Sequence, residues 1–128
     1  MELVISPQSS ETIVTRPVVL EQFIQKGQAE YRLSIPAGLI CFSGHFPGKP
    51  ILPGVAQLDW VFYFSKPLLI DGEMYCIKNL KFMRPIQPND QVSLLLQVSE
   101  GGRCLAFRFF DKNNLLSAGQ LLFKLEGV

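Results

Sequence analysis

The sequence contains one histidine, His45, and few charged residues of either sign. Charged residues make up 18% of the 128 positions and the net charge is +1, so no overall field attracts nucleic acid. No long run of lysine and arginine indicates a nucleic-acid groove either. A single imidazole also cannot build a multi-histidine zinc centre. We therefore predict a chain that binds neither nucleic acid nor a metal.

Cysteine is scarce as well, and the three residues present lie far apart. Cys41, Cys76 and Cys104 have no CxxC spacing, and an odd number argues against a disulfide framework. We interpret them as free thiols packed like small apolar residues, and we expect a cytoplasmic protein. No apolar run is long enough for a membrane span, and residues 1–11 lack the features of a signal peptide.

Apolar residues, by contrast, are abundant. They make up 48% of the sequence, which excludes a disordered chain and supplies one substantial core. A domain of this size cannot hide all of that surface inside itself, so part of it is expected at a subunit interface. No repeat, linker or low-complexity tract interrupts the pattern. We predict a single domain over residues 1–128.

Alternating apolar residues predict several strands joined by short turns. Residues 11–26 mix apolar residues with Pro17 and are interpreted as extended chain that reaches a turn at residues 27–28. Short turns between consecutive strands favour antiparallel neighbours. The clearest strands are predicted over residues 30–35, 75–83, 91–99, 103–110 and 115–125.

One helix is predicted over residues 54–66, between Pro53 and Pro67. Proline fits the first turn of a helix, where its missing N–H is not needed, and stops a helix at the other end. The helix is apolar almost all round, so we expect it to be enclosed on most sides. A curved antiparallel sheet of five or six strands around this central helix gives an α+β fold. It leaves edges and one face that a second copy would cover.

His45 lies in a loop whose composition fixes its shape. Residues 43–53 contain three prolines and two glycines. Fixed geometry is what a general base requires, so acid–base work is the chemistry we assign to His45. The alternative is a loop histidine that makes one structural hydrogen bond.

Asp59 is an isolated acid within the apolar helix, fourteen residues after His45. Burial there would favour its neutral form, and a protonated carboxyl can donate a proton at neutral pH. The alternative is a carboxylate whose charge is met by a buried cation or by backbone amides.

Gly54 begins the predicted helix, where the first N–H groups lack partners and carry partial positive charge. The N–H of Gly54, with that of Val55, can hold a thioester carbonyl and stabilise a developing enolate. The alternative is a glycine needed only for the turn. A base, an acid and such a donor together fit removal of a proton beside a carbonyl and loss of a β-hydroxyl as water.

Two stretches resemble a known family. The sequence GHFPGKPILPGVAQLD at residues 44–59 resembles the signature of the hotdog-fold (3R)-hydroxyacyl-[acyl carrier protein] dehydratases of the FabA/FabZ type. That signature is Gly-His-Phe-x-Gly-x-Pro-x-x-Pro-Gly with an acid fourteen residues after the histidine. LKFMRPIQPNDQV at residues 80–92 resembles a FabZ-like strand–turn–strand, and PGVAQLDW looks most like the small ApeI-like dehydratases of aryl polyene pathways.

The resemblance implies a homodimer with two composite sites, in which His45 of one subunit faces Asp59 of the other. His45 would be the general base, Asp59 the general acid, and the Gly54 N–H the donor to the thioester oxygen. The backbone carbonyl of Ile51 would orient the histidine. The product would be a trans-2-enoyl thioester, no cofactor would be needed, and the substrate would ride on the 4'-phosphopantetheine arm of an acyl carrier protein.

Further features are open to two interpretations. Tyr63 stands four residues after the acid, where the family usually carries a glutamine, and its hydroxyl is a candidate substitute. Lys81 and Arg84 are candidate contacts for an acidic carrier protein. The alternative is that they are ordinary solvated surface charges. Four aromatic residues are candidates for the lining of a substrate tunnel: Phe46, Trp60, Phe62 and Tyr63. The alternative is that they only pack in the core.

Two other functions compete with dehydration. A hotdog thioesterase needs an acid to activate water but has no need for His45 in this loop. A non-catalytic subunit would keep the motif for structure and pair with a related pathway subunit in a hetero-oligomer.

Overall fold

The computed structural model describes residues 13–42, 48–99 and 101–124. The described chain forms one helix, α1 (Gly54–Phe64), two short 3-10 turns, η1 (Ile40–Phe42) and η2 (Lys66–Leu68), and six strands. The strands are β1 (Val18–Gln25), β2 (Gln28–Ser34), β3 (Glu73–Phe82), β4 (Gln91–Val98), β5 (Cys104–Phe110) and β6 (Leu115–Lys124).

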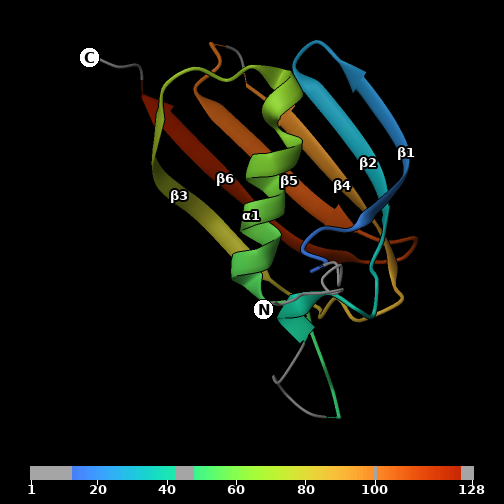
Figure 1. Ribbon diagram of the computed structural model, residues 1–128. Helices are drawn as coiled ribbons and strands as arrows, with labels where there is room; N and C mark the ends of the chain where they lie inside the picture. The colour runs from blue at the N-terminus through green and yellow to red at the C-terminus, as the bar shows by residue number, and fades with distance from the viewer. Residues whose placement is uncertain (1–12, 43–47, 100, 125–128) are drawn as a thin grey trace, which may run out of the picture.

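All six strands belong to one antiparallel sheet with the order β1-β2-β4-β5-β6-β3. The sheet curves, and α1 crosses its inner face (Figure 1). The predicted α+β architecture, a central helix against a curved antiparallel sheet, is therefore confirmed with six strands. β1 and β3 lie at opposite edges of the sheet.

The element boundaries differ from the predicted ones mainly at the helix end and at the first strand. α1 ends at Phe64, earlier than predicted, and Ser65 is its C-cap residue. The Ser65 N–H donates to the Val61 carbonyl at 3.0 Å and its hydroxyl donates to the Phe62 carbonyl at 2.9 Å. Pro67 then lies inside η2. Regular pairing of the first strand begins only at Val18, directly after Pro17, which has no N–H for the ladder.

The core lies between α1 and the inner face of the sheet. Buried and more exposed side chains alternate along β2 and β4, as the sequence pattern predicts, and Leu33, Leu94 and Leu96 are fully buried. Tyr31 on β2 donates its hydroxyl to the Phe64 carbonyl at 2.9 Å and thereby fixes the end of α1 against the sheet. Burial, and then the neighbouring Tyr63, raise the pKa of the Tyr31 hydroxyl.

The outer face of α1 is open in the single chain, so the expectation of a helix enclosed on most sides is wrong at this level. Val55 is 78% exposed, Phe62 39% and Tyr63 36%, and Asp59 is exposed beside them. The sheet covers one side of the helix and residues 13–17 contact one flank at Trp60 and Tyr63, but the described chain places no helix or strand over the other side (Figure 1). The apolar residues of the outer face are therefore available to a second chain.

The edge strand β3 carries apolar surface next to this open helix face. It pairs with β6 on one side, and among the described residues no strand pairs with its other side. Four large apolar side chains on β3 or just after it are exposed: Tyr75, Leu80, Phe82 and Met83.

Within the described ranges, α1 and the 3-10 turns all fall short of the length and apolar character that a membrane-crossing helix requires.

Candidate functional site

The predicted base, His45, and the predicted tunnel residue Phe46 lie outside the described residues. The end of the same loop is described and is well anchored. Leu52 is buried, and its N–H donates to the Ile86 carbonyl at 2.7 Å. Ile51, whose carbonyl is the predicted partner of His45, precedes it and is half-buried. The end of the loop is therefore held against the segment that follows β3.

The start of α1 leaves two backbone donors open. Pro53 is the N-cap residue and has no capping side chain. Its carbonyl accepts from the N–H groups of Ala56 and Gln57, both at 3.1 Å. The N–H groups of Gly54 and Val55 have no hydrogen-bond partner among the described residues. Two donors at the positive end of a helix can hold a carbonyl oxygen that gains negative charge.

The structure gives a further reason for a glycine at position 54, which the sequence did not reveal. A β-carbon at this position would stand 2.6 Å from Cζ of Phe82, at the end of β3. Real β-carbons essentially never come so close to a neighbour, so the aromatic ring occupies the space that a side chain would need. The glycine thus lets β3 pack directly on the first turn of the helix.

Asp59 lies on the outer face of α1, one turn from Val55 and one turn from Tyr63. No described residue forms an ion pair or a hydrogen bond with its carboxyl group. Both interpretations of a buried Asp59, a neutral acid or a charge-matched carboxylate, require burial that the single chain does not provide. A covering element from outside the described residues would have to supply it.

Two cationic side chains lie over the aromatic ring of Tyr63. The guanidinium carbon of Arg16 lies 3.7 Å from the ring centroid and Lys66 Nζ lies 5.0 Å from it. No hydrogen bond of the Tyr63 hydroxyl to another described residue is found, so its assignment as a substitute for the family glutamine stays a prediction. The contact with Arg16 was missed because 47 positions separate the two residues in the sequence.

Arg16 is held beside α1 by the segment that precedes β1. Trp60 Nε1–H donates to the Thr15 carbonyl at 3.0 Å, and the Ile40 N–H donates to the Val14 carbonyl at 2.8 Å. Val14 also forms a parallel bridge with Leu39.

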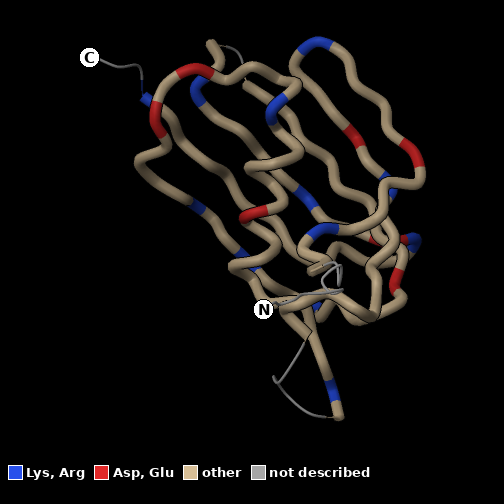
Figure 2. The backbone as a smooth tube through the Cα atoms, in the orientation of Figure 1, with Lys and Arg blue, Asp and Glu red and all other residues tan. Residues whose placement is uncertain are grey.

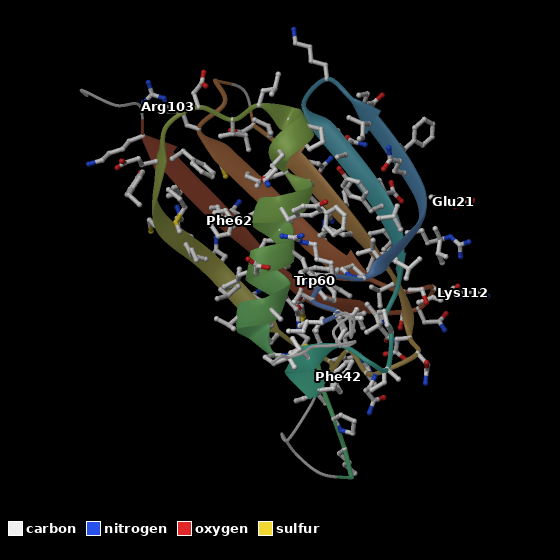
Figure 3. The ribbon with its side chains drawn as sticks, in the orientation of Figure 1. Glu21, Phe42, Trp60, Phe62, Arg103 and Lys112 are labelled. Atoms are coloured by element: carbon white, nitrogen blue, oxygen red, sulfur yellow. The ribbon has the colours of Figure 1, made fainter. Side chains whose placement is uncertain are left out.

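The predicted tunnel aromatics on the helix point in different directions. Trp60 is 1% exposed and packs in the core, whereas Phe62 leaves the other flank of α1 (Figure 3). Phe62 borders a surface hollow of about 430 Å³ at the end of the helix, together with residues of the segment that follows. Of the predicted set, Phe62 and Tyr63 thus reach the open face, and Trp60 does not.

Lys81 and Arg84, the predicted carrier contacts, are both exposed. They flank Phe82, whose ring packs on Gly54, so their backbone lies near the start of α1. Figure 2 shows basic positions along this part of β3. The Arg84 N–H donates to the Leu116 carbonyl at 3.1 Å, which fixes the backbone there. The arrangement permits a basic rim near the open helix start.

The described residues contain no cluster of three or more histidine, cysteine, aspartate or glutamate side chains that could bind a metal. Cys41, Cys76 and Cys104 are free and half-buried. Burial raises the pKa of the Cys41 thiol, which disfavours the reactive thiolate there.

A polar group that the sequence analysis missed lies on the inner face of α1. Gln57 is 3% exposed and hydrogen-bonds to Ser117 of β6, which is 1% exposed. The signal in the sequence was a glutamine within the apolar run, on the side of the helix that faces the sheet.

Comparison with known proteins gives a consistent assignment. The model of the ApeI-like family, described as ApeI dehydratase, matches residues 21–120. The dehydratase heterocomplex ApeI:P from Xenorhabdus doucetiae contains a chain with 33% identity and a TM-score of 0.76; the match covers 84% of this chain and 96% of that chain. An uncharacterized protein from Erwinia carotovora subsp. atroseptica is 32% identical with a TM-score of 0.72, over 87% and 98%.

Curated relatives match over a shorter stretch. The 3-hydroxyacyl-[acyl-carrier-protein] dehydratase FabZ of Haemophilus influenzae is 43% identical in an alignment of 67 residues, and the match covers 45% of this chain and 45% of that protein. The chain thus spans about half the length of the curated relatives it matches. The match of the family model over most of the chain, together with the six-stranded sheet and its central helix, shows that this chain belongs to the ApeI-like family of hotdog-fold dehydratases.

Proposed function

We propose that this protein dehydrates (3R)-3-hydroxyacyl thioesters on an acyl carrier protein to trans-2-enoyl thioesters. The observation that carries the proposal is the placement of Gly54 and Asp59 on one helix, at the end of a motif that also contains His45. Membership of the ApeI-like family and similarity to FabZ support the same reaction.

The chemistry follows from the roles of three groups. His45 takes a proton from C2 of the substrate, and the electron pair forms an enolate on the thioester oxygen, held by the Gly54 N–H. The electrons then form the C2–C3 double bond as the C3–oxygen bond breaks. Asp59 donates a proton to the departing hydroxyl, which leaves as water. Exchange of protons with solvent restores a neutral imidazole and a protonated carboxyl.

The geometry of α1 suits this division of labour. A rise of 1.5 Å per residue places the α-carbons of Gly54 and Asp59 about 7.5 Å apart along the axis. Helical side chains lean toward the N-terminus, so the carboxyl group of Asp59 lies over the turn that contains Val55. The thioester oxygen at the helix start and the hydroxyl beside Asp59 then fall within one short substrate segment.

The acid role requires a second chain. A carboxyl that donates a proton at neutral pH needs a site that excludes water, and no described residue of this chain covers Asp59 on the outer face of α1. We propose that a homodimer forms through the edge strand β3 and this helix face, where large apolar side chains are exposed. His45 of one subunit would then act with Asp59 of the other.

The acyl chain and the carrier have separate candidate contacts. Phe62 and Tyr63 on the open face are suited to an apolar chain that runs along α1. We propose conjugated or aryl chains of the aryl polyene type as substrates, as the resemblance to the ApeI-like dehydratases implies. Lys81 and Arg84 are suited to an acidic carrier at the helix start. Charge reversal of Arg84 should raise KM for carrier-borne substrate and leave turnover of a short pantetheine thioester unchanged.

Turnover of carrier-bound 3-hydroxyacyl chains tests the proposal. Saturated and aryl-conjugated chains are compared with wild type, His45→Ala and Asp59→Asn, and enoyl product and free acid are both measured. We expect enoyl product from wild type and a loss of at least about a hundredfold in both variants. Release of free acid that survives His45→Ala would establish a thioesterase instead.

The Xenorhabdus doucetiae heterocomplex supports a second candidate, in which this chain is one subunit of a hetero-oligomer. Under this alternative the purified chain alone yields no enoyl product, and activity appears only after a related subunit is added. Wild-type turnover by the isolated chain would exclude an obligatory partner.

A further inference from the structure

The inner face of α1 contains one buried polar side chain where an apolar residue would be expected. Gln57 is 3% exposed, and apart from Ser117 the other buried side chains of the described core are apolar or aromatic. A buried amide is tolerated only when it is hydrogen-bonded, because its water partners are lost. A methionine or leucine would fill a similar volume without that requirement. Packing alone therefore does not explain a glutamine at this position.

The amide of Gln57 connects three parts of the fold. The hydroxyl of Ser117, on β6, donates to Gln57 Oε1 at 2.6 Å. Gln57 Nε2–H in turn donates to the carbonyl oxygen of Leu52 at 3.3 Å. A side chain on the helix thus bridges the sheet and the loop that leads into the helix.

Leu52 is held from both sides by these contacts. Its carbonyl oxygen accepts from Gln57, and its N–H donates to the Ile86 carbonyl at 2.7 Å. The residue is also buried, with 3% exposure. Its two flanking peptide groups can neither rotate nor shift without breaking a buried hydrogen bond, which is costly.

The position of Leu52 controls the backbone at the start of α1. One residue, Pro53, lies between Leu52 and Gly54, and its φ of −64° is restricted by its ring. The direction of the Gly54 N–H therefore depends closely on the orientation of the Leu52–Pro53 peptide. The Ile51 carbonyl lies on the other side of the same residue. The bond from Gln57 thus acts on the peptide next to the Gly54 N–H, whereas the Leu52 N–H bond to Ile86 holds the peptide that contains the Ile51 carbonyl.

We propose that Gln57 is a positioning residue for dehydration, which holds the Leu52 carbonyl so that the Gly54 N–H points at the thioester oxygen. This inference rests on the proposed function. Gln57 touches neither the substrate nor the reacting atoms; it acts through its hydrogen bond to the Leu52 carbonyl. Because the effect falls on a donor that acts most strongly on the developing enolate, removal should lower kcat more than it raises KM.

Three variants separate positioning from folding. Gln57→Met removes the donor to Leu52 at similar volume, and Ser117→Ala removes the other hydrogen bond of the same amide but leaves Gln57 Nε2 in place. The double variant Gln57→Met/Ser117→Ala also removes the hydroxyl that the single change leaves without an acceptor, so it should regain part of the lost thermal stability.

We expect Gln57→Met to lower kcat by about ten- to a hundredfold, since a misplacement of about 1 Å in a site can cost that much. KM should change less than about threefold, and Ser117→Ala should keep kcat within about threefold. The double variant should regain stability without regaining kcat. Equal kcat losses in the two single variants, or a kcat that recovers with stability, would overturn the proposal.

Amide hydrogen exchange, followed by NMR, gives a readout that does not depend on turnover. Gln57→Met should speed exchange at the Leu52 N–H and shift the Gly54 amide resonance, and Ser117→Ala should do neither. If wild type forms no enoyl product, the proposed function fails, while these amide signals still show whether Gln57 fixes the helix start. Unchanged Leu52 and Gly54 signals in Gln57→Met would overturn the positioning role by themselves.

Discussion

The ring of Phe82 occupies the place of a side chain at position 54, because a β-carbon on Gly54 would stand 2.6 Å from Phe82 Cζ. The end of β3 and the first turn of α1 therefore meet through a glycine and an aromatic ring. This contact brings an edge strand of the sheet to the two open N–H groups of Gly54 and Val55. The backbone donors, the open helix face and the unpaired strand edge thus form one continuous region.

Gly54→Ala should displace the Phe82 ring and lower dehydration. The ring is 48% exposed and can swing outward, so the loss of unfolding free energy should stay below about 2 kcal/mol. The measurements are kcat/KM with carrier-bound substrate and the urea midpoint of unfolding.

The double variant Gly54→Ala/Phe82→Leu distinguishes two reasons for the glycine. A smaller side chain at position 82 relieves the clash, so stability should return. We expect activity to stay low, because the methyl group still obstructs approach of a thioester oxygen to the backbone. Recovery of activity together with stability would show that the glycine serves packing alone.

Tyr63 should act through its ring rather than through its hydroxyl. Arg16 stacks on the ring at 3.7 Å, and such contacts contribute about 0.5–1 kcal/mol at exposed sites. We expect Tyr63→Phe to keep activity and melting temperature close to wild type, and Tyr63→Leu to lower the melting temperature. A loss of kcat in Tyr63→Phe would contradict this and assign the hydroxyl a role beside Asp59.

The turn between β5 and β6 should make the folding stability of the protein depend on pH in the acid range. Asp111 Oδ1 accepts the N–H groups of Asn113 at 3.0 Å and Asn114 at 2.9 Å, and these bonds lower the pKa of the Asp111 carboxyl. A lowered folded-state pKa stabilises the fold above the ordinary carboxyl value of about 4, and this stability is lost as pH falls through the lowered value.

Asp111→Asn tests this dependence. The variant should be less stable than wild type at pH 7, and the difference should shrink as the pH falls below about 4. Urea unfolding at several pH values measures it. A difference that stays constant down to pH 2 would show that the charge on Asp111 is not responsible.

Mixing two inactive variants tests the composite site. His45→Ala and Asp59→Asn homodimers each lack one group in both sites, whereas a mixed dimer has one intact site out of two. Random exchange makes half of the dimers mixed, so an equal mixture should regain about a quarter of wild-type activity. No recovery, once subunit exchange is verified by mass spectrometry, would place both groups in the same chain.

The sequence predicted the parts of this fold that depend on local pattern. Alternation along β2 and β4 and the prolines around α1 are local signals, and the structure confirms the elements they indicate. The motif that contains His45 and Asp59 was likewise readable from its spacing. The exposure of α1 could not be predicted, because an apolar pattern does not say whether the helix is covered by its own sheet or by a second chain.

The contacts that refine the candidate site could not be predicted from the sequence, for a different reason. Gly54 meets Phe82, Arg16 meets Tyr63, and Gln57 meets Ser117 across 28, 47 and 60 positions of the sequence. Each pair depends on how the sheet curves around the helix. Single-sequence patterns specify elements, whereas these pairings arise only once the elements are packed.

The strand order also has a practical use for attaching the protein to surfaces or labels. β1 lies at the edge opposite β3, and its turn into β2 passes through Lys26, an exposed amine, and Gly27, whose φ is 75°. A dye, a biotin or an immobilising tether introduced at this turn would lie across the sheet from the helix start and from the proposed dimer edge. Surface-bound protein of this kind would keep the proposed carrier-binding side free for binding measurements.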